Sequence, residues 1–139
     1  MAKTVRTVWI EKQQYLGVDS SNHSVVMSSQ DEENGTGVSP SELLLLSLAA
    51  CTSYDVVSIL TKKRQRLTGL EVTVTGEQDA DPPWTYRKMH VRYEVRGKGL
   101  GEKAVEDAIE LSETKYCSVA ATLRGTVELT YDYTIIEDD

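Results

Sequence analysis

Residues 39–57 read Ser39-Pro-Ser-Glu-Leu-Leu-Leu-Leu-Ser-Leu-Ala-Ala-Cys51-Thr-Ser-Tyr-Asp-Val-Val57. Ser39 suits a helix N-cap, Pro40 suits the first helical position, and Glu42 follows the N-cap by three residues to complete a capping box. We predict a helix from about residue 40 to about residue 66. Its first half is apolar nearly all round, which is typical of a helix buried on every side. Because one small chain covers such a helix poorly, we expect a homodimer.

Segments of alternating apolar and polar residues lie on both sides of this helix and predict strands. Three short strands, at residues 4–10, 14–18 and 24–28, predict an antiparallel N-terminal sheet over about residues 3–28. A C-terminal α+β part over about residues 69–136 contains these elements in order: strands 70–75 and 88–95, helices 102–113 and 117–123, and strand 126–136. This order predicts an α+β fold rather than alternating βαβ units. With no linker evident, we predict a single domain over residues 1–139.

Charge and hydropathy exclude several classes of protein. A net charge of -7 argues against nucleic-acid binding. The N-terminus lacks the apolar segment of a signal peptide, and the longest apolar stretch, residues 43–50, is too short to span a bilayer. We therefore expect a cytoplasmic protein with no membrane partner. In that compartment a reactive disulfide is more plausible than a structural one.

The chain has two cysteines, Cys51 and Cys117. Cys51 lies in the apolar helix, and Cys117 lies at the predicted start of a short helix, where the dipole and free backbone N–H groups stabilise a thiolate. If the two thiols meet, they suit dithiol redox chemistry; if they do not, they are two small core residues. Because His23 and His90 lie far from both cysteines and from each other in the chain, no metal site and no cofactor is predicted.

Two segments of the chain resemble the OsmC/Ohr family (osmotically inducible protein C and organic hydroperoxide resistance protein): Gly37-Val-Ser-Pro-Ser-Glu-Leu-Leu-Leu-Leu-Ser-Leu-Ala-Ala-Cys-Thr52, and Leu-Ser-Glu-Thr-Lys-Tyr-Cys117-Ser-Val. The resemblance covers nearly the whole chain. It implies an OsmC-like intertwined dimer, with antiparallel sheets packed around two long central helices and each active site at the dimer interface. It also implies that Cys51 is a peroxidatic cysteine and Cys117 a resolving one. Organic hydroperoxides would be the substrate, and a small dithiol or a dithiol protein the reductant.

The sequence departs from the peroxidase branches of that family at two places. Those branches have a Glu ten residues before the first cysteine, where this chain has Ser41. Glu42 lies one residue later, which turns a side chain by about 100° on a helix, so Glu42 is better explained as the capping acid. The branches also have an Arg in the N-terminal sheet, and no Arg lies between Val8 and Gln30. With these two departures, the chain resembles a third, OsmC-like branch of the family more closely than it resembles the peroxidase branches. The cations that could lower the pKa of Cys51 instead are Lys115, His90, Arg87 and Arg124.

Other residues of the long helix are candidates for lining the site: Ser41, Glu42, Ser47, Tyr54 and Asp55. Each also has an ordinary explanation as a cap, a helix-surface residue or a hydrogen-bonded core residue. Asp55 lies one turn after Cys51 and would raise the thiol pKa if it faced the sulfur.

Two functions remain open. The first is a thiol-dependent peroxidase acting through a two-cysteine disulfide cycle, with an apolar lining that favours alkyl or fatty hydroperoxides. The second is a non-catalytic OsmC-like dimer that binds a small apolar or thiol ligand, with cysteines that sense redox state or merely pack. The missing Arg and displaced Glu favour the second function.

Overall fold

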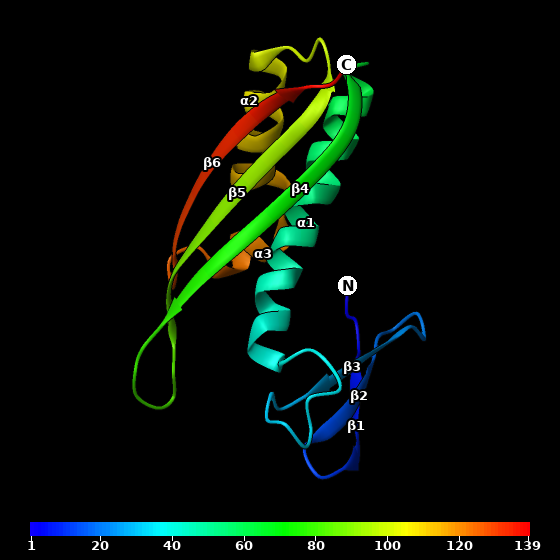
Figure 1. Ribbon diagram of the computed structural model, residues 1–139, viewed down its shortest axis with the longest axis vertical. Helices are drawn as coiled ribbons and strands as arrows, with labels where there is room; N and C mark the ends of the chain where they lie inside the picture. Colours follow the sequence, from blue (N-terminus) through cyan, green and yellow to red (C-terminus); the bar gives the residue numbers. More distant parts are fainter. The chain divides into compact units, whose positions relative to one another are not determined.

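A computed structural model describes residues 1–139 and contains two three-stranded sheets and three α-helices (Figure 1). Residues 1–44 and residues 45–139 form two compact units, and the boundary between them falls within the long helix. The mixture of sheets and helices confirms the predicted α+β class. A single domain over the whole chain stays a prediction.

The N-terminal unit is built on an antiparallel sheet in the order β1-β2-β3. Its strands are β1 (Arg6–Glu11), β2 (Gln14–Val18) and β3 (Ser24–Ser28). The predicted N-terminal sheet is therefore present, and its last two strands have the predicted bounds. Asp19 shapes the turn between β2 and β3, because its carboxylate accepts hydrogen bonds from the backbone N–H groups of Ser21 and His23.

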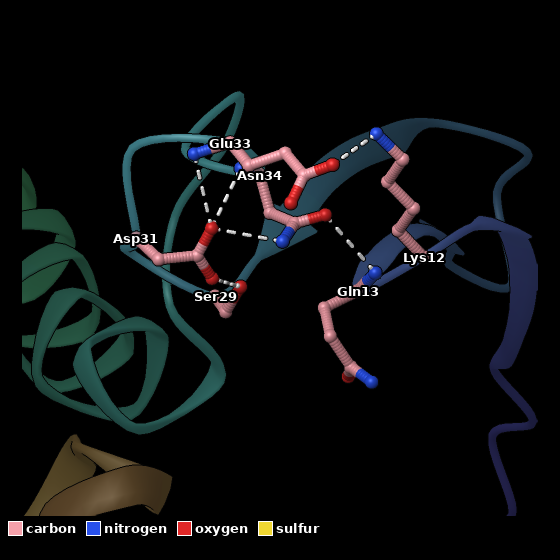
Figure 2. A network of polar contacts seen from close by, with 6 residues as sticks. All are labelled: Lys12, Gln13, Ser29, Asp31, Glu33 and Asn34. Atoms are coloured by element: carbon pink, nitrogen blue, oxygen red, sulfur yellow. Dashed lines mark hydrogen bonds and ion pairs between the residues drawn. The ribbon is translucent and has the colours of Figure 1, made fainter.

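A network of polar groups holds the loop that follows β3 (Figure 2). The Asp31 carboxylate accepts hydrogen bonds from the Ser29 hydroxyl at 2.5 Å and from the Asn34 amide at 2.8 Å. The backbone N–H groups of Asn34 and Glu33 also donate to it. The Ser29 hydroxyl and the Asn34 amide make the largest contributions to lowering the pKa of Asp31 to about 2. Because Asn34 Oδ1 accepts from the Gln13 N–H at 3.2 Å, the network also ties this loop to the β1–β2 turn.

Helix α1 (Pro40–Lys62) begins with the predicted cap. The Glu42 N–H donates to Ser39 Oγ at 3.3 Å, and the Ser39 hydroxyl donates to the Glu42 carboxylate at 2.9 Å. The helix ends before the predicted boundary near Arg66. Arg64 adopts a φ of 57°, in the left-handed region that terminates helices.

The C-terminal unit contains a mixed sheet in the order β4-β5-β6. Its strands are β4 (Arg66–Gln78), β5 (Tyr86–Lys98) and β6 (Glu128–Glu137). Strands β4 and β5 form an antiparallel hairpin, but β6 is parallel to β5. The prediction of purely antiparallel sheets is therefore wrong for β6. The helical connection between β5 and β6 returns the chain to the starting end of β5, so β6 runs in the same direction.

Three helical elements follow one another in this connection: α2 (Glu102–Leu111), a π-helical turn η1 (Ser112–Tyr116) and α3 (Ser118–Leu123). Helices α1, α2 and α3 lie on the same face of the sheet (Figure 1). Strand β5 buries every second side chain on that face: Met89, Val91, Tyr93 and Val95. Helix α1 contributes a stripe of buried residues at four-residue spacing: Leu48, Thr52, Val56 and Leu60. Both cysteines are thus on elements that pack over one face of one sheet.

The opposite side of α1 is apolar but uncovered in the single chain. Leu46 is 52% exposed, Tyr54 77% and Val57 41%. One chain thus covers the helix poorly, as expected from the sequence, and burial of the helix on every side stays a prediction. By length and composition alone α1 would also be able to cross a membrane, a property that core helices of soluble proteins share. Its buried stripe is that of a helix packed on a sheet.

Candidate active site

Cys51 lies on α1 at the margin of the stripe that packs against the sheet. Its neighbour Thr52 is fully buried, whereas Cys51 is half-buried. Successive residues on a helix are turned by about 100°, so the thiol lies at the edge of the core. The sulfur is thereby both partly desolvated and partly accessible.

Cys117 is the N-cap of α3. Its sulfur accepts a hydrogen bond from the Ala120 N–H at 3.3 Å, and its side chain is buried. Its own N–H donates to the Ser112 carbonyl at 2.9 Å, which closes the π-helical turn before it. Hydrogen bonds on both sides therefore hold this cysteine in place.

The two thiols are free and are joined by a hydrogen bond between their side chains. Ser118 Oγ lies 4.0 Å from Cys51 Sγ. The backbone N–H groups of Ser118 and Val119, in the first turn of α3, also donate to the Cys51 sulfur. The fold thus brings the two predicted cysteines side by side, with the start of α3 directed at Cys51.

The surroundings of Cys51 favour its thiolate. Burial raises the pKa of the Cys51 thiol, but hydrogen bonds from the Cys117 thiol, from the Val119 N–H and from Ser118 together outweigh burial. The net result is a pKa below the ordinary value. Neutral donors, rather than a cation, make the largest contributions to this lowering.

The surroundings of Cys117 have the opposite effect. Burial, followed by the hydrogen bond to Cys51, raises the pKa of Cys117 to about 12, although the Ala120 N–H lowers it. The expectation that a helix start makes Cys117 a stabilised thiolate is therefore wrong, because desolvation outweighs one backbone donor. When this pair loses one proton, the negative charge resides on Cys51 and Cys117 donates its S–H to it.

A buried polar pair that we did not predict from the sequence packs beside the thiols. The Tyr93 hydroxyl, on β5, donates a short hydrogen bond to Glu113 Oε1, on η1. Tyr93 is 0% exposed and Glu113 is 4% exposed. The Thr52 hydroxyl lies beside the Tyr93 oxygen and partly offsets the rise in the tyrosine pKa. One tyrosine therefore joins the helix that carries Cys51 to the turn that precedes Cys117.

The protonation of this pair is set mainly by burial. Burial raises the pKa of Glu113, and the Tyr93 hydrogen bond and the charge of Arg124 offset part of that effect. Burial and the neighbouring Glu113 raise the pKa of Tyr93 above its ordinary value. A sequence signal for Glu113 did exist: it follows the buried Ile109 by four residues and so lies on the inward face of the helix.

Two of the other candidate site residues lie in the N-terminal unit. The Glu42 carboxylate is bound to Ser39 in the helix cap, and Ser41 is exposed on the first turn of α1. The structure therefore agrees with the capping explanation of Glu42. A role for either residue in lining the site stays a prediction.

The remaining candidates lie on the part of α1 that belongs to the C-terminal unit. The Asp55 carboxylate accepts a hydrogen bond from the Ser112 hydroxyl at 2.9 Å, which ties α1 to the turn before Cys117. Ser47 and Tyr54 are exposed. Asp55 therefore contacts an element of the thiol site.

The cations considered from the sequence have other partners. Their contacts are Arg87 with Asp79 at 2.8 Å, His90 with Asp132 at 2.9 Å, and Lys115 over the ring of Tyr116 at 5.2 Å. The charge of Arg124 acts on Glu113. No cluster of three or more His, Cys, Asp or Glu side chains forms a possible metal site.

A separate groove of about 420 Å³ lies on the N-terminal unit. Apolar side chains supply much of its lining, among them Val5, Val25, Met27 and Leu43. It is large enough for a small organic molecule.

The α+β fold brings two cysteines together beside a long apolar helix. This arrangement is that of a dithiol protein of the class that the sequence resembles. Residues 32–132 match the family model described as OsmC-like protein, and the chain belongs to this family. It is similar to Protein YhfA of Escherichia coli (strain K12), with 34% identity over 131 residues that cover 94% of this chain and 96% of that relative.

Solved structures share the fold. A hypothetical protein from Aquifex aeolicus VF5 has 27% sequence identity and a TM-score of 0.88, and the match covers 100% of this chain and 99% of that one. The organic hydroperoxide resistance protein OhrB of Bacillus subtilis has 14% identity and a TM-score of 0.63, with 96% and 98% covered. The likeness to OhrB shows the fold alone.

Proposed function

We propose that this chain is a thiol-dependent peroxidase that reduces organic hydroperoxides through a disulfide cycle between Cys51 and Cys117. The observation that carries the proposal is the hydrogen bond between the two thiols, with the pKa of Cys51 lowered and that of Cys117 raised. Membership of the OsmC-like family supports the redox class. The shared fold with a protein titled organic hydroperoxide resistance protein agrees with the substrate class.

In the first step the Cys51 thiolate attacks the terminal oxygen of the hydroperoxide. The O–O bond breaks, Cys51 becomes a sulfenic acid, and the leaving alkoxide takes up a proton to form the alcohol. A lowered pKa increases the fraction of Cys51 present as the reactive thiolate. Because the side chain is half-buried rather than enclosed, a hydroperoxide has access to the sulfur.

In the second step the Cys117 sulfur attacks the Cys51 sulfenic sulfur. An S–S bond forms, the S–O bond breaks, and the hydroxide leaves as water after gaining a proton. The two thiols are already in hydrogen-bond contact, so closure requires little movement. A small dithiol, or a dithiol protein, then reduces the disulfide and is itself oxidised to a disulfide.

Neutral donors take the place of the guanidinium that peroxidase branches of the family use. The Cys117 S–H and the N–H groups of Ser118 and Val119 all donate to the Cys51 sulfur. Several hydrogen bonds to one anion lower its pKa without any charged partner. The lack of an Arg between Val8 and Gln30 is therefore compatible with a reactive Cys51.

The same proposal includes a homodimer and a cytoplasmic location. The uncovered apolar side of α1, which includes Leu46, Tyr54 and Val57, is of the kind that a second copy covers. Sedimentation velocity should give the mass of a dimer, and Tyr54→Glu should shift it toward the monomer. A wild-type protein that sediments as a monomer at micromolar concentration contradicts this part. Two free thiols in contact suit a reducing compartment.

The test of the peroxidase is a titration of the reduced protein with cumene hydroperoxide. We expect each chain to consume one equivalent and to lose both free thiols. Cys51→Ser should abolish consumption, whereas Cys117→Ser should consume hydroperoxide and stop at a sulfenic acid that dimedone traps. An unchanged rate in Cys51→Ser, or wild-type thiols that survive the titration, would exclude the peroxidase.

The second candidate is the non-catalytic dimer that binds a small apolar or thiol ligand. The groove of about 420 Å³ on the N-terminal unit is the observation that favours it. Thiols that stay inert to hydroperoxide, together with saturable binding of an apolar fluorescent probe, are the results expected of this candidate.

A further inference from the structure

We propose that Glu113, acting through the Tyr93 hydroxyl, accepts the proton that Cys117 must lose before it attacks Cys51. The inference rests on the proposed function, because it concerns the closure step of that cycle. Glu113 would be a positioning residue, since it reaches the reacting sulfur through Tyr93.

Closure needs a proton acceptor inside the protein. A thiol attacks as its thiolate, and Cys117 is 2% exposed, so bulk water has little access to its proton. Burial and the hydrogen bond to Cys51 also raise the pKa of Cys117 to about 12. Spontaneous loss of the proton near neutral pH is therefore rare, and a nearby base would accelerate the step.

Glu113 and Tyr93 are placed to supply that base. Glu113 lies on the turn η1, which the Cys117 N–H closes by donating to the Ser112 carbonyl. The Tyr93 hydroxyl donates directly to Glu113 Oε1. Tyr93 and Cys117 belong to the same cluster of buried core side chains, and a thiolate at Cys117 would raise the tyrosine pKa.

The buried carboxylate is costly, which points to a use for its charge. Removing a carboxylate from water is unfavourable, and a Gln at this position would still accept the Tyr93 hydrogen bond without that cost. The groups that face Glu113 are Tyr93 on β5, Tyr131 on β6 and Arg124 after α3. Burial raises the pKa of Glu113 above its ordinary value, and a carboxylate with a raised pKa is a stronger base.

The protons balance over the step. The Cys117 proton passes to the Tyr93 oxygen while the Tyr93 proton passes to the Glu113 carboxylate. The Cys117 sulfur then forms the S–S bond and hydroxide leaves Cys51. Glu113 finally returns its proton to that hydroxide through solvent, so the net products are the disulfide and one water molecule.

Closure can be measured without any hydroperoxide. Reduced protein treated with dithiobis-nitrobenzoate releases one coloured thionitrobenzoate as Cys51 is modified. A second is released when Cys117 displaces the group from Cys51 and forms the disulfide. The rate of this second release, followed by stopped-flow absorbance over a range of pH, reports the attack by Cys117. Cys117→Ser defines the baseline, because it lacks the second thiol.

We expect the wild-type rate of the second release to rise with pH as Glu113 ionises. Glu113→Gln and Tyr93→Phe should each slow it by roughly 10²-fold, the lower end of what a general base contributes, and should remove that pH dependence. The matched control is Glu110→Gln, which alters an exposed side chain near the site and should keep the wild-type profile.

Two outcomes overturn the inference. One is a Glu113→Gln rate equal to that of the wild type. The other is a rate lowered by one constant factor with the pH profile retained, which is the mark of a merely structural role. If cumene hydroperoxide leaves Cys51 unoxidised while the second release still depends on Glu113, then the peroxidase proposal fails and this inference stands.

Discussion

Replacing Cys117 with Ala should make Cys51 a weaker acid. The Cys117 S–H is the side-chain donor that contributes most to lowering the pKa of the Cys51 thiol. A hydrogen bond to a charged group contributes about 1.5–3 kcal/mol, and S–H is a weak donor, so the lower end applies. Since about 1.4 kcal/mol corresponds to one pKa unit, Cys117→Ala should raise the pKa of Cys51 by about one unit.

The assay is the rate of Cys51 alkylation by iodoacetamide as a function of pH. Below the pKa the thiolate fraction falls tenfold for each unit by which the pKa rises, so alkylation at neutral pH should slow about tenfold. Cys117→Ser keeps a hydroxyl donor at the same position and should have a smaller effect. Ser118→Ala should also have a smaller effect, because its hydroxyl lies 4.0 Å from the sulfur.

Two results would contradict this prediction. An alkylation profile of Cys117→Ala that superimposes on that of the wild type would mean that the thiol pair does not set the acidity of Cys51. A pKa that falls in this variant would show that loss of buried bulk, with entry of water, outweighs the lost hydrogen bond. Either result would remove the main support for Cys51 as the attacking cysteine.

Three further predictions concern stability. Ser39→Ala removes the cap of α1 and should lower the free energy of unfolding in urea by about 1 kcal/mol; Ser39→Asp, which keeps a cap, should not. Leu60→Ala leaves a cavity in the core and should lower the free energy of unfolding by about 2–5 kcal/mol. Folding raises the pKa of Glu113, so between the two pKa values the folded chain binds more protons than the unfolded chain. The free energy of unfolding of the wild type therefore falls as the pH rises from the ordinary Glu pKa through the raised one. Glu113→Gln should lack this fall and be at least as stable at neutral pH; a less stable variant there would contradict the sign.

Much of the fold was predictable from short-range patterns. Two strands of the N-terminal sheet have the predicted bounds, because alternation of side chains marks a half-buried strand wherever it occurs. The Ser39–Glu42 cap was predictable because it involves residues three apart. The direction of β6 was not predictable. Alternation of side chains indicates which face of a strand is buried, and this pattern is the same whether the neighbouring strand is parallel or antiparallel. The left-handed Arg64 was also missed, because this conformation is uncommon for any residue other than Gly.

The two cysteines of the site were predictable from the sequence, but which of the two thiols has the lower pKa was not. Cys51 and Cys117 were evident from the sequence, but the local pattern predicted that the helix start would favour a thiolate at Cys117. The structure reverses that order, because burial raises the pKa of Cys117 while hydrogen bonds from Cys117 and from the start of α3 lower the pKa of Cys51. The Glu113–Tyr93 pair joins residues from two elements, so the spacing of Glu113 after Ile109 could place its side chain inward but could not identify its partner.

By itself the sequence determined the α+β class, the start of the central helix and the two thiols, since caps, periodicity and residue chemistry act over a few neighbours. Only the tertiary structure decided which sulfur carries the charge, which way β6 runs and which carboxylate is buried beside the thiols. Those properties depend on desolvation and on donors that come from distant parts of the chain, and no local pattern contains that information.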